Sequence, residues 1–134
     1  RDNSYSSLGT SLGPEIGPNA ESWFFRTLYL PLRNLRLSLS VTLVREGENF
    51  FDASGKLINV GGDFLQPHRP SDPLERFFLD GILIKTRRIN LITTYEVRNQ
   101  IWLEAWYEFE SMNNTSLKSS ATNHTFGGRL RMEF

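Results

Sequence analysis

The chain has 134 residues, with 15 basic and 15 acidic side chains and a formal net charge of zero. This length suits a single domain, and the charge balance offers no basic patch of the kind that binds nucleic acid. There is no cysteine, which excludes disulfides, thiol catalysis and cysteine-based metal sites.

The N-terminal part changes character at Ser22. Residues 1–20 are rich in Ser, Gly and Pro and are predicted to form a loop. An aromatic stretch, SWFFRTLYL, follows, and after the short turn PLRN comes the clearest pattern in the chain, LRLSLSVTL (35–43). Its apolar residues occupy every second position. This period of two predicts a β-strand, because a helix would scatter the leucines around its circumference.

A long polar connection is predicted over residues 46–77. Within it, FFDASGKLINV reads as a small hairpin that turns at Ser54–Gly55. The three prolines of QPHRPSDP exclude a central strand. Asp52, Asp63 and Asp72 offer oxygen ligands for calcium, but their spacing matches no known calcium loop.

The C-terminal half is predicted to contain three more strands. The first runs from FFLDGILI through RRINLITTYEV, and the second, IWLEAWYEFE, follows the tight turn VRNQ. A polar loop is predicted over residues 111–124, and the last strand over residues 125–134. With no helix and no repeat in the pattern, the predicted fold class is all-β, with antiparallel strands in a single β domain over residues 1–134.

The connections alternate between short and long. If the last strand ends on the periplasmic side, the tight turns fall there and the long loops 46–77 and 111–124 fall outside, as in outer-membrane barrels. Strands of about ten residues match a tilted crossing of a bilayer. These features predict a segment of a β-barrel in the bacterial outer membrane, with outer-membrane lipid as a partner. A soluble β-sandwich is the alternative, because its strands would alternate in the same way.

Five long strands are fewer than the roughly eight that a barrel needs. Closure is therefore expected to require further barrel strands from outside this chain segment, and residues 125–134 are predicted to pair with one of them. Aromatic residues expected near the tight-turn interface are Tyr29, Tyr95 and Phe134. The terminal RLRMEF would point Leu130, Met132 and Phe134 toward lipid, and Arg129, Arg131 and Glu133 toward the interior.

The charged face of the last two strands holds the candidate ligand-binding residues. Glu104 and Glu108 form a carboxylate pair of the kind that hydrolyses glycosides, but arginines one strand away favour an ion-pair wall, and no catalytic site is predicted. The two tryptophans that flank Glu104 could stack on a sugar or fill a lumen. The candidate set is Trp102, Glu104, Trp106, Glu108, Arg129 and Arg131. His68 and His124 lack metal-ligand spacing, and neither a metal nor a cofactor is predicted.

Several strings resemble a known family. LGTSLGPEIGPNAES (8–22), VREGENFFDASGKLINVGGDFLQPHRPSDP (44–73) and FLDG (78–81) are similar to the C-terminal part of the Wzi-type capsule-assembly outer-membrane barrels, and RLRMEF resembles the C-terminal signal that barrel-assembly machinery reads. The resemblance implies a surface lectin that holds capsular polysaccharide to the outer membrane. A porin-like solute channel and a surface protein whose loops bind a protein partner are the alternatives.

Overall fold

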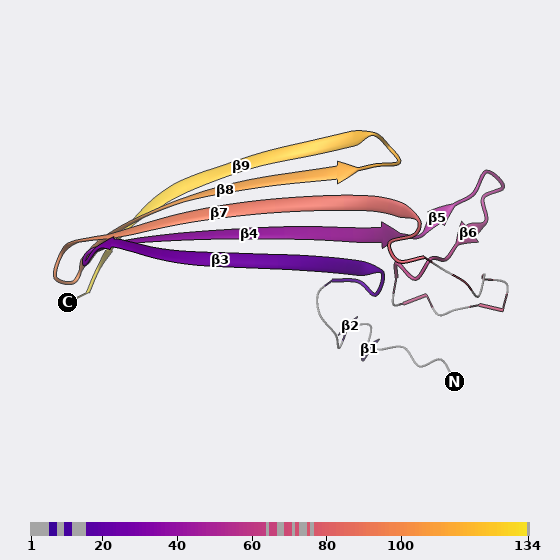
Figure 1. Cartoon of the computed structure of the whole chain (residues 1–134), viewed down its shortest axis with the longest axis horizontal. Coiled ribbons are helices and arrows are strands. Elements are labelled where there is room, and N and C mark those ends of the chain that lie inside the picture. Colours follow the sequence, from indigo (N-terminus) through magenta and orange to yellow (C-terminus); the bar gives the residue numbers. More distant parts are fainter. Residues whose placement is uncertain are drawn as a thin grey trace. The chain divides into compact units, whose positions relative to one another are not determined.

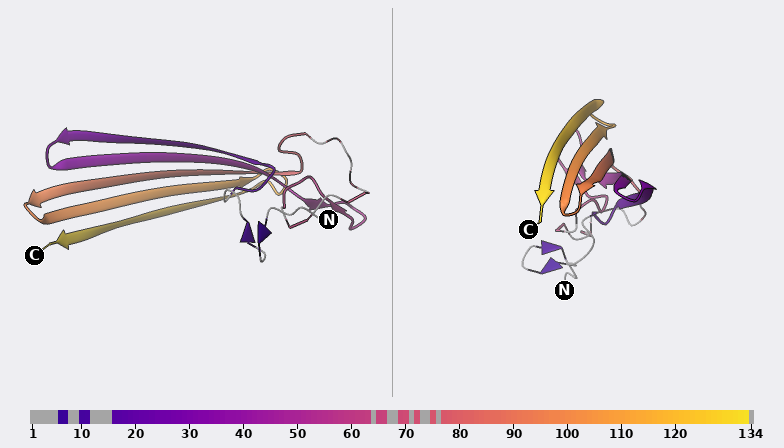
Figure 2. Two further views of the ribbon diagram at one scale, coloured as in Figure 1. Left: turned by 90° about the horizontal axis from the view of Figure 1, so that it is seen from below. Right: turned by 90° about the vertical axis from the view of Figure 1, so that its left-hand side faces the viewer.

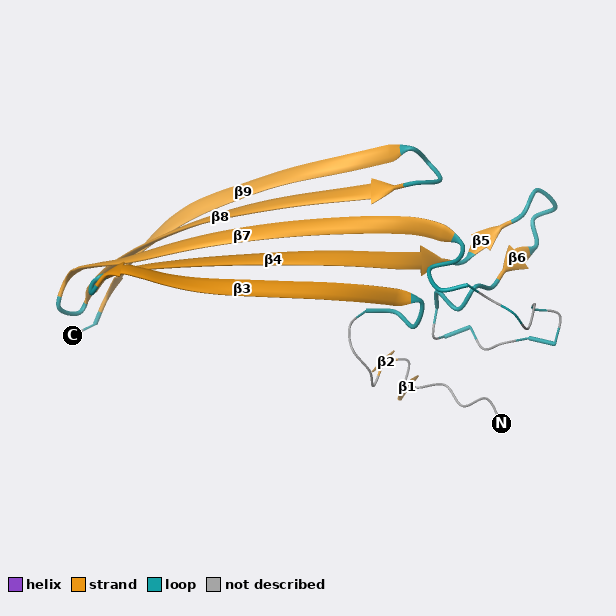
Figure 3. Cartoon of the chain, in the orientation of Figure 1, coloured by secondary structure: helices purple, strands orange, loops and turns teal. Residues whose placement is uncertain are grey.

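The described part of the chain is all-β and contains no helix (Figure 3). The computed structural model describes residues 6–7, 10–11, 16–63, 65–66, 69–70, 72, 75 and 77–133. The strands are β1 (Ser6–Ser7), β2 (Thr10–Ser11), β3 (Ala20–Leu32), β4 (Leu35–Glu48), β5 (Phe50–Phe51), β6 (Leu57–Ile58), β7 (Ile82–Arg98), β8 (Ile101–Asn114) and β9 (Ser119–Met132) (Figure 1). The predicted all-β class is therefore confirmed.

Five long strands form one antiparallel sheet in the order β3-β4-β7-β8-β9, which is also their order in the chain. The same order is visible in both views of Figure 2. The chain divides into two compact units: unit 1 contains residues 1–22, 44–85 and 113–119, and unit 2 contains residues 23–43, 86–112 and 120–134. Each long strand has most of its length in unit 2.

The two predicted tight turns both lie in unit 2. Residues 33–34 join β3 to β4, and residues 99–100 join β7 to β8. The Glu96 N–H donates to the Asn34 carbonyl (2.8 Å), and the Glu133 N–H donates to the carbonyl of Gln100 (3.0 Å), which has a φ of 68°. These bonds tie each turn to the end of a neighbouring strand, so both turns and the C-terminal end of β9 lie together (Figure 2). This end is called the turn end below.

Two predicted connections differ from the structure. β4 continues to Glu48 and β7 begins only at Ile82, not at residue 77, so the long connection begins and ends later than the predicted 46–77. Instead of a loop over residues 111–124, β8 continues to Asn114 and β9 begins at Ser119, leaving only the turn 115–118. Polar residues extend these strands because backbone groups, not side chains, make the ladder. The Asn114 side chain accepts the N–H groups of Ser116 (3.1 Å) and Leu117 (3.0 Å) and closes the turn.

Other predicted features are present in unit 1. The hairpin in FFDASGKLINV is confirmed, with β5 paired to β6. Its turn is held by the Asp52 carboxylate, which accepts the Ser54 hydroxyl (2.6 Å) and the Lys56 N–H (3.0 Å). These bonds, led by the Ser54 hydroxyl, lower the pKa of Asp52. In the stretch 1–20, β1 pairs with β2; residues 1–5, 8–9 and 12–15 lie outside the described residues.

Buried apolar side chains are few. Among the described residues only Val60 and Ile84 qualify, and both belong to unit 1. The described part of unit 2 thus has no buried apolar core of its own. No helix among the described residues is long and apolar enough to cross a membrane.

Asn19 is the central polar residue of unit 1. Its buried side chain donates to the carbonyls of Gly47 (3.0 Å) and Asp80 (3.0 Å) and accepts the Leu79 N–H (2.8 Å). A Cβ at position 47 would overlap the Asn19 amide, so glycine is needed there. Asn19 thereby joins the start of β3 to the end of β4 and to the segment before β7.

Replacing Asn19 with Ala should loosen this junction. The change removes the side-chain partner of the buried Gly47 carbonyl and of the part-buried Leu79 N–H, at a cost of up to roughly 1–3 kcal/mol each. We expect the Leu79 amide to exchange with solvent at least about ten-fold faster, measured by hydrogen exchange. Asn113→Ala is the control, because Asn113 is exposed and its side chain has no hydrogen bond among the described residues. Equal exchange in both variants would contradict the role given to Asn19.

Candidate functional site

One face of the sheet in unit 2 is polar on β4, β7, β8 and β9 and is held by contacts between neighbouring strands, while on β3 the same face carries the exposed Phe24, Leu28 and Leu30 beside Arg26. On β8 and β9, Arg129 Nη2 lies 2.8 Å from Glu104 Oε1. On β7 and β8, Arg88 Nη2 lies 3.0 Å from Glu110 Oε1. Side chains alternate between faces along a strand, so these pairs define the polar face: even-numbered residues of β7 and β8 and odd-numbered residues of β9.

On the opposite, apolar face, every strand has a nine-residue stretch whose five residues on this face are uncharged. Its members are the alternate residues of 23–31, 35–43, 89–97, 101–109 and 124–132. None of them is Asp, Glu, Lys or Arg. On β7, charge returns on this face at Arg87, beyond the end of the stretch that lies farther from the turn end. The five stretches thus form one apolar band across unit 2.

Side chains of this band are exposed along the sheet. Phe126 is 83% exposed and Trp23 is 68% exposed. Of the predicted interface aromatics, Tyr29 and Tyr95 lie on this face and are exposed, while Phe134 lies outside the described residues. The described part of unit 2 therefore leaves its apolar face uncovered.

His124 lies on β9 in this face, and not in a loop as predicted. Its Nδ1 is 2.8 Å from the Tyr107 hydroxyl, and its ring centroid is 5.2 Å from that of Phe109. The Tyr107 and His124 polar groups thus satisfy each other on an apolar surface, which lowers the cost of placing them there. His68 lies outside the described residues.

The predicted ligand-binding residues all lie on the polar face and interact in pairs. The cross-strand ion pair is confirmed between Glu104 and Arg129. The Arg131 guanidinium lies 4.4 Å from the centroid of the Trp102 ring, an arrangement that favours cation–π attraction. Glu108 instead faces β7, where it accepts the Asn90 amide (3.3 Å). The polar face thus carries both signs of charge, and its side chains contact one another across neighbouring strands.

Trp106 occupies a place that depends on a glycine. A Cβ at position 127 would overlap the Trp106 indole, so the ring lies directly over the backbone of Gly127 on the next strand. Gly128 is different, because a Cβ there would meet only the Glu104 carbonyl at 3.5 Å. The prediction from the sequence did not include Gly127; a glycine inside a strand is the available signal, since it often marks such close approach.

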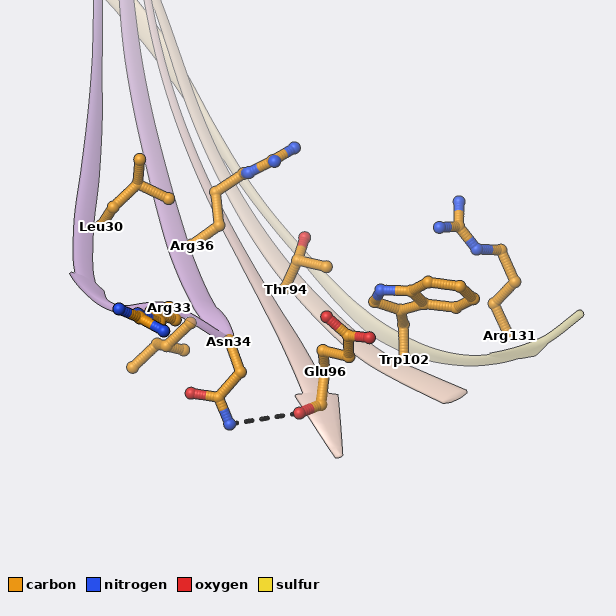
Figure 4. Close-up of a pocket in the computed structure, with 9 residues that line it drawn as sticks. Leu30, Arg33, Asn34, Arg36, Thr94, Glu96, Trp102 and Arg131 are labelled. Atoms are coloured by element: carbon orange, nitrogen blue, oxygen red, sulfur yellow. Dashed lines mark hydrogen bonds between the residues drawn. The ribbon is translucent and has the colours of Figure 1, made fainter. Parts of the chain in front are cut away.

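A hollow of about 180 Å³ lies at the turn end of unit 2 (Figure 4). It is lined by Leu30, Arg33, Asn34, Leu35, Arg36, Thr94, Glu96, Trp102 and Arg131. Figure 4 shows Arg36, Thr94 and Trp102 on one side of the sheet, with Arg131 beyond the indole. Of the predicted site residues, only Trp102 and Arg131 line this hollow. Arg33 and Arg36 were not predicted as site residues, because they come from the β3–β4 hairpin.

The three aspartates considered for calcium bind protein groups instead. Asp52 holds the β5–β6 turn, Asp63 accepts the Leu65 N–H (2.8 Å), and Asp72 pairs with Arg69 (2.9 Å). No group of three or more His, Asp or Glu residues suited to a metal occurs in the described part of the chain.

Comparisons with protein-family models, with curated proteins and with solved structures found no match. The functional argument therefore depends on the residues of this chain.

Replacing Gly127 with Ala should displace the Trp106 ring. Overpacking of this kind costs roughly 1–3 kcal/mol. With 5-fluorotryptophan at the three tryptophans, we expect the ¹⁹F resonance of Trp106 to shift or broaden. Gly128→Ala is the matched control, because it adds the same methyl group where space exists. An unchanged Trp106 signal in the Gly127 variant would contradict the stacking described above.

Proposed function

We propose that this chain is part of a bacterial outer-membrane β-barrel whose polar face binds surface polysaccharide. The observation that carries the proposal is the separation of the two faces of unit 2. One face has an uncovered apolar band on all five strands, and the other has Arg–Glu pairs and tryptophans. Lipid would cover the first face, and the second would line the interior.

The dimensions of the apolar band support lipid as its cover. Nine strand residues span about 30 Å. A strand tilt of about 40° reduces the height to about 23 Å, close to the roughly 25 Å apolar band of outer-membrane barrels.

Closure of such a barrel requires strands from outside this chain. β3 and β9 are the edges of the sheet, and an unpaired backbone group in hydrocarbon costs several kcal/mol. In an antiparallel sheet of five strands the two edge strands run in the same direction. A second copy in the same orientation would therefore join through a parallel pair. A purely antiparallel barrel needs an odd number of further strands instead, and three would give the minimum of about eight.

Two features support polysaccharide as the ligand. Trp102 and Trp106 place aromatic surfaces on the polar face beside charged groups, a combination suited to the apolar and hydroxylated sides of a sugar. The resemblance of residues 8–22 and 44–73 to Wzi-type barrels points to the same ligand class.

A porin-like channel is the second candidate, because a polar face with both signs of charge also suits a water-filled lumen. Steady conductance of the protein in a planar bilayer would favour the channel.

Brominated lipids test the membrane orientation. Trp23 lies in the apolar band and Trp106 on the polar face, so bromine on the acyl chains should quench Trp23 strongly and Trp106 weakly. One variant keeps only Trp23 (Trp102→Phe with Trp106→Phe), and the other keeps only Trp106 (Trp23→Phe with Trp102→Phe). The measurement is the fluorescence of each in vesicles of brominated and ordinary phosphatidylcholine.

Equal quenching of the two tryptophans would contradict the proposed orientation. Recovery of the protein in the aqueous fraction, without lipid or detergent, would instead favour the soluble β-sandwich.

A further inference from the structure

The hollow at the turn end differs from the rest of the polar face in its charge. Three arginines and one glutamate line it: Arg33, Arg36, Arg131 and Glu96. Elsewhere on this face, Arg88 and Arg129 each pair with a glutamate. The hollow therefore has an excess of positive charge, whereas a glutamate neutralises each of these two other arginines on the polar face.

Two of these arginines have no protein partner. Among the described residues, no hydrogen bond or ion pair engages the side chain of Arg33 or Arg36. Arg131 meets Glu133 only at 3.5 Å, with both side chains more than half exposed, and such exposed pairs contribute little. The guanidinium groups thus keep donors available for an anion in the hollow.

Two hydrogen bonds hold the turn that lines the hollow, and a tryptophan ring lines it as well. The Asn34 amide donates to the Glu96 carbonyl (3.2 Å), and the Glu96 N–H donates to the Asn34 carbonyl (2.8 Å). This pair of bonds holds the β3–β4 turn against the end of β7 (Figure 4). Trp102 stands at the other side, and the Arg131 guanidinium, 4.4 Å from its centroid, orients the ring.

We propose that this hollow binds one carboxylate-bearing sugar unit of an acidic polysaccharide, an inference that rests on the function proposed above. A carboxylate accepts two parallel N–H bonds from an arginine fork, which suits Arg36. The Trp102 ring offers an apolar surface to the C–H side of the sugar. A cavity of about 180 Å³ has room for a single unit, and the rest of the polymer would continue along the polar face from this end, predicted to be periplasmic, toward the cell surface.

Binding of tetragalacturonate tests the inference. The comparison ligand is the same oligosaccharide with its carboxyl groups reduced to alcohols, so each carboxylate is replaced by a neutral hydroxymethyl group on an unchanged sugar ring. Isothermal titration calorimetry on the whole protein in detergent micelles gives the affinities. We expect tetragalacturonate to bind more tightly than the reduced form, and Arg36→Gln to weaken it roughly ten-fold or more, the range for a hydrogen bond to a charged group.

Arg87→Gln is the control for net charge. Arg87 is exposed, is an odd-numbered residue of β7 on the opposite face of the sheet, and its removal changes the net charge by the same amount. The affinity of the Arg87→Gln variant for tetragalacturonate should stay close to that of the unsubstituted protein. Arg36→Lys keeps the charge without the planar fork, and should recover only part of the loss.

Three results would overturn the inference. If both oligosaccharides bind equally and Arg36→Gln has no effect, polysaccharide binding stands but the acidic-sugar site is wrong. If Arg36→Gln and Arg87→Gln weaken binding equally, the attraction is general and not located in the hollow. If neither oligosaccharide nor any capsular polysaccharide binds, the proposed polysaccharide function fails together with the inference.

Discussion

The uncovered apolar face of unit 2 is the constraint on which the rest of the structure depends. Each of its five strands places five successive uncharged residues on that face, and none of the described apolar side chains in the unit is buried. Burial of apolar surface is the main favourable term in folding. A sheet of this kind needs a cover, and lipid is the cover that we propose.

The polar face depends on the register between β8 and β9. Successive positions along β8, Trp102, Glu104 and Trp106, meet Arg131, Arg129 and Gly127 on β9. A slip of one residue would turn every one of these side chains to the opposite face. The ion pair, the cation–π contact and the ring over glycine therefore support the same alignment of β8 and β9. They connect the two strands on the polar face, where the described part of unit 2 has no buried core.

Much of this arrangement could be predicted from the alternation of residues. The strand over 35–43, both tight turns and the pair of Glu104 with Arg129 follow from a period of two and from short connections. The predicted loop over 111–124 is a short turn, because a polar composition does not prevent backbone pairing. The hollow could not be predicted, since Arg36 on β4 and Arg131 on β9 belong to strands that are not neighbours in the sheet.

The central claim is that lipid covers the apolar face, and spin labels along β4 test it most directly. The chain has no cysteine, so single cysteines can be introduced and labelled at each position from Leu35 to Leu43 in turn. In vesicles, collisions with oxygen should be most frequent at the odd-numbered positions, and collisions with a polar nickel complex at Ser40 and Thr42, which share the polar face and are not buried. Odd-numbered positions shielded from both reagents would mean that protein, not lipid, covers this face.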